Sequence, residues 1–340
     1  MGKITVKGID VLSDSRRHNV YDLLREFDPK LVAGPSPMGS SYYKTLLTCP
    51  REFGLRNRAM LAPDVPREHL VVGWLFHVCL QYYYEAIGAY QRANPNRPSD
   101  PEWLWGGSNA GMKKAYEVVT LLRSVQGYGR TADTLQLLLD GYFERYDRQD
   151  KWRIVAVEVT LQHHKLGYSA RLDLLVHDLE RGGLFIVEHK TARQITSDLI
   201  DNYQLDLQIL GQAWLFLECV DLTKYPRFMG IRINIATKHK TGSQTVRLDV
   251  YPSQRHLLEF ERSVVQYKRL LPVVEELGWP KAFHCSGYSR GYSQCQFYDI
   301  CHGHPLISVD EWSKSVPPEG FLRRDPLEHN PIEEWDVGGG

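Results

Sequence analysis

Two carboxylates and one lysine lie in or directly after two neighbouring apolar stretches in the middle of this 340-residue chain. Glu188 and Lys190 follow the apolar run 183–187, and Asp173 lies in a second apolar stretch upstream. Because residues i and i+2 of a strand share a face, Glu188 and Lys190 are expected to point together while His189 points away.

The segment 178–183 between the two stretches ends in two glycines, which can take the left-handed conformations of a tight reversal. A hairpin there would bring Asp173 across from Glu188, so that two oxygen ligands and the Lys190 ammonium meet at one edge of a sheet. Oxygen ligands suit Mg²⁺ or Mn²⁺, and such an ion binds a phosphate and lowers the pKa of its water. Lys190 would orient that water or help to deprotonate it. The pattern therefore predicts hydrolysis of phosphodiesters.

A simpler interpretation of the same three residues is that they are ordinary charges at strand ends, because short patterns of this kind also arise by chance. If they do form a site, alanine at any of the three positions should abolish cleavage. Little loss of folding is expected with it, because a sheet edge packs little.

The composition is that of a globular protein, with 43% hydrophobic and 24% charged residues. No apolar run approaches the ~18 residues of a membrane span, and residues 1–6 lack an apolar signal core. We therefore expect a cytoplasmic protein without a membrane partner. Basic and acidic residues balance at 41 each, so nucleic-acid binding would need local patches, for example around Arg51 to Arg58 or at 238–240. The alternative for each patch is a solvated face.

Periodicity predicts helices in the first part of the chain and a helix-flanked sheet in the second, with a boundary near residue 150. A first helix is expected to begin after Ser40 or Ser41, and the tail after Phe321 is expected to be peripheral or mobile. Further helices are expected at 71–91, 132–148, 199–219 and 253–277, strands at 153–162, 167–177, 184–190, 228–236 and 245–251, and a loop at 94–107.

The six cysteines are distributed unevenly, at positions 49, 79, 219, 285, 295 and 301. Cys79 and Cys219 lie in apolar helix-like stretches and are expected in the core. The other four lie in segments that could build little core, and they could supply the thiolates of a 4Fe-4S cluster or of a zinc site. An intracellular chain disfavours disulfides, and the gaps of nine and five residues among the last three differ from close zinc-type pairs. A cluster is therefore preferred, and it would join the two ends of the chain.

Taken in chain order, these features resemble the PD-(D/E)XK nucleases of the RecB/AddB type, in particular their iron–sulfur members. That group includes CRISPR-associated adaptation exonucleases, exonuclease V-type enzymes and related phage proteins. The resemblance runs from about Ser40 to Cys301, and its parts are Cys49-Pro-Arg, Gly73-x-x-x-His77, Glu158, Asp173, Glu188-x-Lys190, Gln208 and Cys295 to Cys301. The Gln-x-x-x-Tyr element of the family would begin at Gln208, yet position 212 is glutamine here.

The resemblance implies an α/β fold with a restriction-endonuclease-like mixed central sheet flanked by helices. An N-terminal helical lobe and a C-terminal cysteine-ligated iron–sulfur lobe would complete it. The implied divisions are a helical lobe with the first cluster cysteine (1–150), a nuclease core (151–280), an iron–sulfur segment (281–310) and a tail (311–340).

The resemblance also implies roles for individual residues. His77, Asp173 and Glu188 would bind the metal, and Lys190 would be the catalytic lysine. The remaining implied roles are those of Glu158 and Gln208 in catalysis and of Cys49, Cys285, Cys295 and Cys301 as ligands of a 4Fe-4S cluster. Without the motif order, a lone helical histidine would be read as a core or surface residue, and Glu158 as the end of a strand.

The expected activity is that of a Mg²⁺- or Mn²⁺-dependent DNA exonuclease acting on single-stranded or end-opened DNA. Two alternatives stay open: a noncatalytic DNA-binding or assembly subunit with a structural iron–sulfur lobe, and a nuclease acting on RNA. Recombination proteins or CRISPR-adaptation proteins are candidate partners, and the oligomeric state stays open.

Overall fold

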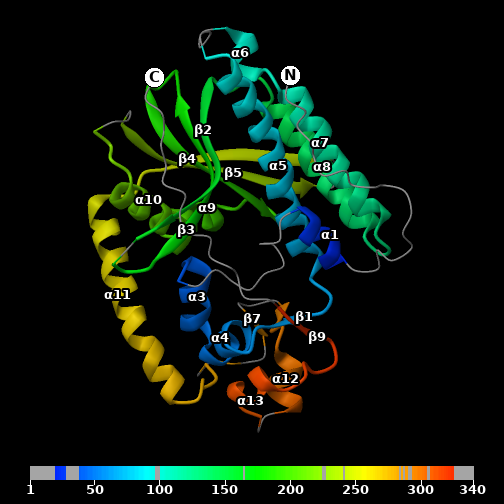
Figure 1. The fold of residues 1–340 in the computed structure, drawn as a ribbon, viewed down its shortest axis with the longest axis vertical. Coiled ribbons are helices and arrows are strands. Elements are labelled where there is room, and N and C mark those ends of the chain that lie inside the picture. Colours follow the sequence, from blue (N-terminus) through cyan, green and yellow to red (C-terminus); the bar gives the residue numbers. More distant parts are fainter. Residues whose placement is uncertain are drawn as a thin grey trace.

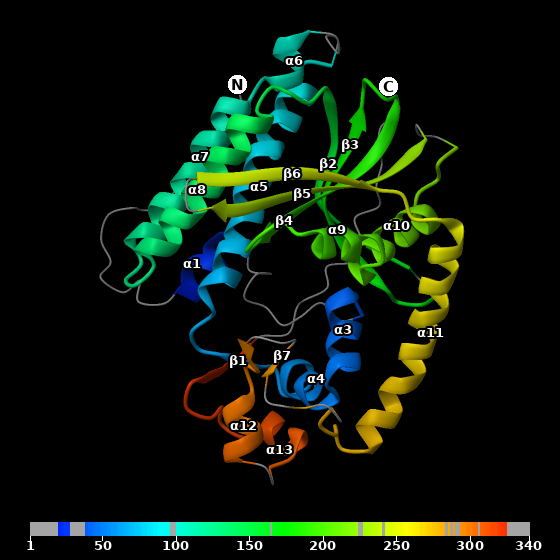
Figure 2. The ribbon, with the colours of Figure 1, turned by 180° about the vertical axis from the view of Figure 1, so that it is seen from behind.

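The structure is a computed structural model that describes residues 20–27, 38–95, 100–163, 165–223, 227–239, 242–282, 285, 288–289, 293–304 and 307–324. A central sheet and the helices around it form the larger body of the molecule (Figure 1). A smaller lobe of α3, α4, α12 and α13 lies at one end, and the long helix α11 runs from the sheet toward it (Figures 1 and 2).

The described helices are α1 (Val20–Phe27), α3 (Ser40–Thr48), α4 (Pro50–Asn57), α5 (Glu68–Ala93), α6 (Pro101–Trp105), α7 (Ser108–Ser124), α8 (Gly129–Tyr146), α9 (Ser197–Gln204), α10 (Leu207–Cys219), α11 (Gln254–Glu276), α12 (Tyr298–Gly303) and α13 (Val309–Lys314). The described strands are β1 (Leu61–Pro63), β2 (Trp152–Gln162), β3 (Ser169–Asp178), β4 (Gly183–Ala192), β5 (Phe228–His239), β6 (Gly242–Val250), β7 (Tyr288–Ser289), β8 (Ser293–Gln294) and β9 (Phe321–Arg323).

The central sheet has five strands in the order β2-β3-β4-β5-β6, and only its β4–β5 pair is parallel. A parallel pair needs a crossover connection, and α9 and α10 supply it. The β3–β4 hairpin turns through Gly182, whose φ of 68° is left-handed, so the expected reversal is confirmed. The mixed central sheet flanked by helices, predicted from the sequence, is also confirmed.

Both faces of the sheet are apolar because helices cover both. Leu174 and Val187 belong to a core that β2 to β5 share with α1, α5, α7 and α8. Leu175 and Ile186, one position along each strand, belong to a second core with α3, α10 and α11. None of the helices in the described ranges combines the length and the apolarity needed to cross a membrane.

A third core joins parts of the chain that are far apart in sequence. Side chains of α3, α4 and β1 pack there with the end of α11 and with α12 and α13. Strand β1 pairs antiparallel with β9, and the Arg323 guanidinium donates to the carbonyls of Ala59, Trp312 and Ser315. The tail expected to be peripheral or mobile after Phe321 begins with Leu322 and Arg323, which are paired with β1 rather than mobile, while residues 325–340 lie outside the described part.

Several elements differ from the sequence-based expectation. The helix expected over 199–219 is split in two, because the Asp206 carboxylate accepts the backbone N–H of Gln208 at 2.8 Å and caps a new helix there. The expected loop 94–107 contains α6, capped in the same way by Asp100. Helix α7 was not expected.

Candidate active site

The two acids lie where strands β3 and β4 separate. The last cross-strand pair of this ladder is Leu174 with Val187, so the next two residues, Asp173 and Glu188, have no ladder between them. Instead the Asp173 carboxylate accepts the backbone N–H of His189 at 2.8 Å. Both strands are internal to the sheet, and Asp173 and Glu188 are 8% and 0% exposed. The expected edge position is therefore wrong, because β2 and β5 flank these two strands.

Glu158 stands opposite Asp173 on β2, between the pairs Val157–Leu174 and Val159–Leu172. Its φ of 53° is left-handed, a conformation that costs about 1–3 kcal/mol for a residue with a side chain. Burial raises the pKa of Glu158 to about 8, although Arg171, whose Nε lies 2.8 Å from Oε2, opposes the shift. Glu158 is thus a strained residue inside a strand, and the expectation that it could end a strand is wrong.

His77 reaches this point from α5. Its Nδ1 lies 3.1 Å from Oδ2 of Asp173. Burial would raise the pKa of Asp173, but the neighbouring His77 outweighs it and holds this pKa below its usual range. Burial would lower the pKa of His77, and Asp173 in turn outweighs that and raises it. The imidazole therefore faces a carboxylate, which does not fit a histidine packed only in the core.

His77, Glu158 and Asp173 together offer one nitrogen and two oxygen ligand atoms that all lie within 4.8 Å of one another. Two carboxylates and an imidazole suit Mn²⁺, and the carboxylates also suit Mg²⁺. The structure thus brings Glu158 next to the predicted ligands His77 and Asp173. Glu188, the third predicted ligand, lies outside this group of three.

Glu188 is held by donors from β4 and α10. Its Oε1 accepts from Nζ of Lys190 at 2.5 Å and from Nε2 of Gln208 at 2.6 Å. Burial and the charge of Asp173 raise the pKa of Glu188. Burial would lower the pKa of Lys190, but Glu188 and Asp173 outweigh it and raise this pKa, so the side chain is an ammonium. The predicted grouping of Glu188, Lys190 and Gln208 is present.

Gln212 also contacts Glu188, and this contact was not expected from the sequence. Its Nε2 lies 2.6 Å from Oε2 of Glu188, and the side chain is fully buried. The signal was available, because residues i and i+4 of a helix share a face and Gln208 was already placed at the site.

His189 points to the opposite face, as expected. Its ring stacks on Tyr84 with centroids 5.7 Å apart, and its Nδ1 lies 3.4 Å from Nδ2 of Asn234. The Asn234 amide is oriented by Arg247, whose Nε donates to Oδ1 at 2.7 Å. Burial lowers the pKa of His189 to about 3, so the imidazole is neutral.

Four of the cysteines line one pocket in the smaller lobe. Cys49 caps the start of α4, Cys301 lies on α12, and Cys285 and Cys295 complete the set. Among the described residues, no three thiols come within 4.8 Å of one another. All six cysteines are free of disulfides. Cys79 is buried as expected, whereas Cys219 is exposed, because it ends α10 at the surface.

The basic patches expected near Arg51 and at 238–240 are largely engaged within the protein. Arg51 donates to the carbonyl of Ile307 at 2.6 Å, Arg58 pairs with Glu275 at 3.1 Å, and Lys238 donates to Thr134 at 3.1 Å. Lys240 lies outside the described residues.

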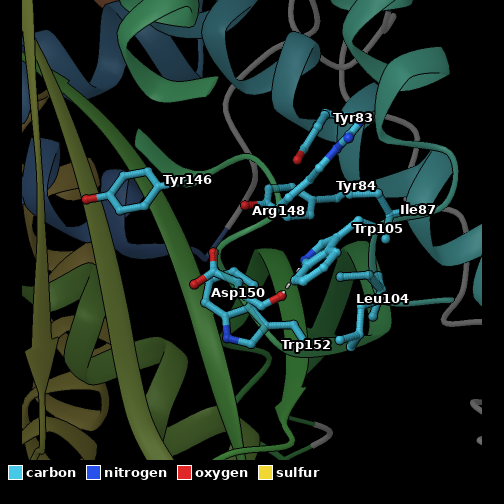
Figure 3. A pocket seen from close by; sticks show the side chains of 10 residues that line it. Tyr83, Tyr84, Ile87, Leu104, Trp105, Tyr146, Arg148, Asp150 and Trp152 are labelled. Atoms are coloured by element: carbon cyan, nitrogen blue, oxygen red, sulfur yellow. Dashed lines mark hydrogen bonds between the residues drawn. The ribbon is translucent and has the colours of Figure 1, made fainter. Parts of the chain in front are cut away.

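A small hollow beside β2 is separate from the site. It is lined by side chains of α5, α6 and β2, with Trp105 donating to the carbonyl of Asp150 (Figure 3). Its volume of about 20 Å³ fits one water molecule, and none of the candidate site residues lines it.

Comparison with known proteins places this chain in a nuclease superfamily. A family model for the PD-(D/E)XK nuclease superfamily matches residues 38–302, and the chain belongs to this superfamily. No curated protein matches the chain significantly. Among solved structures, the chain is similar to a crystal structure from Eubacterium rectale described as a candidate exonuclease, with 13% identity, 83% of this chain and 91% of that chain covered, and a TM-score of 0.39. Family membership indicates a hydrolytic nuclease with a nucleic-acid substrate.

Proposed function

We propose that this chain is a Mg²⁺- or Mn²⁺-dependent deoxyribonuclease that acts as an exonuclease on single-stranded or end-opened DNA. The observation that carries the proposal is the grouping of His77, Glu158 and Asp173 within 4.8 Å, beside the Glu188–Lys190 pair, in a chain of a nuclease superfamily.

His77, Asp173 and Glu188 would hold the metal, and Glu158 is a further ligand from the strained position on β2. A bound ion of this kind neutralises phosphate charge and makes its water more acidic. Lys190 is held as an ammonium by Glu188 and Gln208, so it donates hydrogen bonds and orients the water rather than removing its proton. The buried position of Glu188 strengthens its attraction for this ammonium, because little water surrounds the carboxylate.

The test is incubation of purified protein and Mn²⁺ with end-labelled linear single-stranded DNA, circular single-stranded DNA, linear duplex DNA and RNA. We expect cleavage of linear DNA and resistance of the circle, because an exonuclease needs an end. The Glu188→Gln variant should be inactive, and Glu117→Gln, an exposed residue of α7, should match the wild type. Cleavage of RNA alone would favour the RNA nuclease, and binding of DNA without cleavage would favour the assembly subunit.

We also propose that Cys49, Cys285, Cys295 and Cys301 ligate a 4Fe-4S cluster, as in the iron–sulfur members of the RecB/AddB type. The support is their common pocket. Lys281, which donates to the carbonyl of Cys301 at 2.9 Å, adds positive charge beside the thiolates. Ultraviolet–visible spectra and iron and zinc content after anaerobic purification test the proposal, and stoichiometric zinc without iron would contradict it.

A further inference from the structure

Gln212 bridges the two strands at the point where they separate. Its Nε2 donates to Oε2 of Glu188 on β4 at 2.6 Å and to the carbonyl of Arg171 on β3 at 3.2 Å. The β3–β4 ladder has already ended at Leu174 and Val187, so no backbone pair fixes the distance between Asp173 and Glu188. One amide group on α10 spans the opening that the ladder leaves, in addition to the hydrogen bond from the His189 N–H to Asp173 across it.

The orientation of this amide is fixed by its neighbours. Both groups near Nε2 are acceptors, a carboxylate oxygen and a carbonyl, so exchanging the amide N and O would place an acceptor against both of them. The position of the helix is fixed as well, because its capping residue Asp206 forms an ion pair with Lys44 of α3 at 2.9 Å.

The two oxygens of Glu188 differ in how many protein donors they receive. Oε1 accepts from both Lys190 and Gln208, whereas Oε2 accepts from Gln212 alone among the described residues. A carboxylate has about four acceptor positions, so the free one is on Oε2. A metal ion would bind Glu188 through the oxygen that Gln212 holds.

We propose that Gln212 is a positioning residue that fixes Oε2 of Glu188 and its separation from Asp173 for metal binding. The inference rests on the proposed function, because it gives this amide a role in the metal-dependent site. Partners that orient a metal ligand are worth about 10–100-fold in metal affinity or activity.

The test compares Gln212→Met, which has similar length and no donor, with the wild type and with Gln266→Met on the exposed face of α11 as a matched control. Isothermal titration with Mn²⁺ in the absence of DNA gives the metal affinity, and thermal unfolding gives the stability. We expect the Mn²⁺ Kd of Gln212→Met to rise about 10–100-fold and kcat at low Mn²⁺ to fall in proportion. The KM for DNA at saturating Mn²⁺ should be unchanged, and Gln266→Met should match the wild type throughout.

Should Gln212→Met fail to fold, Gln212→Asn replaces it, because its side chain is one methylene shorter and withdraws the donor from Glu188 while keeping a polar amide. An unchanged Mn²⁺ Kd in a folded variant, with or without a lower unfolding temperature, would overturn the inference and leave the nuclease standing. A wild type that neither binds Mn²⁺ nor cleaves DNA would overturn the proposed function, and the inference with it.

Discussion

Replacing Lys190 by methionine tests whether the buried ion pair at the site also supports the fold. The Lys190 ammonium lies 2.5 Å from Oε1 of Glu188, and the Glu188 side chain is 0% exposed while that of Lys190 is 22% exposed. Removing one partner of a buried pair costs about 3–5 kcal/mol, because the other charge stays buried without compensation. The amides of Gln208 and Gln212 still donate to Glu188, so we expect the lower end, about 3 kcal/mol.

The assay is urea unfolding at pH 7, followed by circular dichroism, together with cleavage of labelled DNA. The double variant Lys190→Met with Glu188→Gln removes both charges and should recover most of the lost stability while staying inactive. Lys151→Met is the matched control, because Lys151 forms an exposed pair with Glu180 at 2.8 Å, and it should cost at most about 1 kcal/mol. In the single variant Lys190→Met, Glu188 has a raised pKa in the folded state. The stability that this variant loses should therefore shrink as the pH falls, because Glu188 then takes up a proton.

Two results would refute this reasoning. One is a Lys190→Met variant that loses no more stability than the exposed control. The other is a double variant no more stable than the single one. Either result would mean that Glu188 is solvated in solution, contrary to its burial here.

His77→Ala should weaken Mn²⁺ binding more than DNA binding, and high Mn²⁺ should partly restore cleavage; an unfolded variant that no metal concentration rescues would favour a core histidine. Cys301→Ala should bleach the cluster absorbance and lower the unfolding temperature, whereas Cys219→Ala should keep the colour, and a colourless wild type would contradict the cluster. The pKa of His189 is lowered to about 3 in the folded state, so the imidazole binds no proton at pH 5. In the unfolded chain its pKa is near 6.5, so it does bind a proton there. The contribution of His189 to stability should therefore fall by about 2 kcal/mol from pH 7 to pH 5, and this part of the pH dependence should be absent from His189→Gln, as measured by urea unfolding; equal pH dependence in both chains would mean that the imidazole is not buried neutral.

The strands of the central sheet were predicted well because the sequence patterns that indicate strands are local. Alternating and continuous apolar runs, with glycines at Gly182 and Gly183, give strands β3 and β4 and the reversal between them. The parallel β4–β5 pair and the surface pairing of β1 with β9 depend on contacts distant in sequence, which no local pattern reports. The split between α9 and α10 could have been read from Asp206, a good capping residue before an apolar run.

The site was predicted only in part, because the sequence signals report local structure and not tertiary contacts. Residue types and spacing picked out Asp173, Glu188 and Lys190, but their burial depends on α10 packing over the separating strands. The placement of Glu158 beside His77 depends on a left-handed residue inside β2, which its amino-acid type does not favour. Tertiary contacts therefore decide which of the acids come together.

In the smaller lobe α3, α4 and β1 pack with α12, α13 and β9, and this packing has a consequence for protein synthesis. The central sheet is complete once β6 has been made, at Val250, whereas Arg323 must still find the carbonyl of Ala59, 264 residues earlier. Contacts between segments so far apart form late, because the long loop between them must close first. On the ribosome the nuclease core can thus fold before the segments around Cys49 and Cys301 come into contact. The smaller lobe would then be completed only after β9 has been translated, later than the catalytic core.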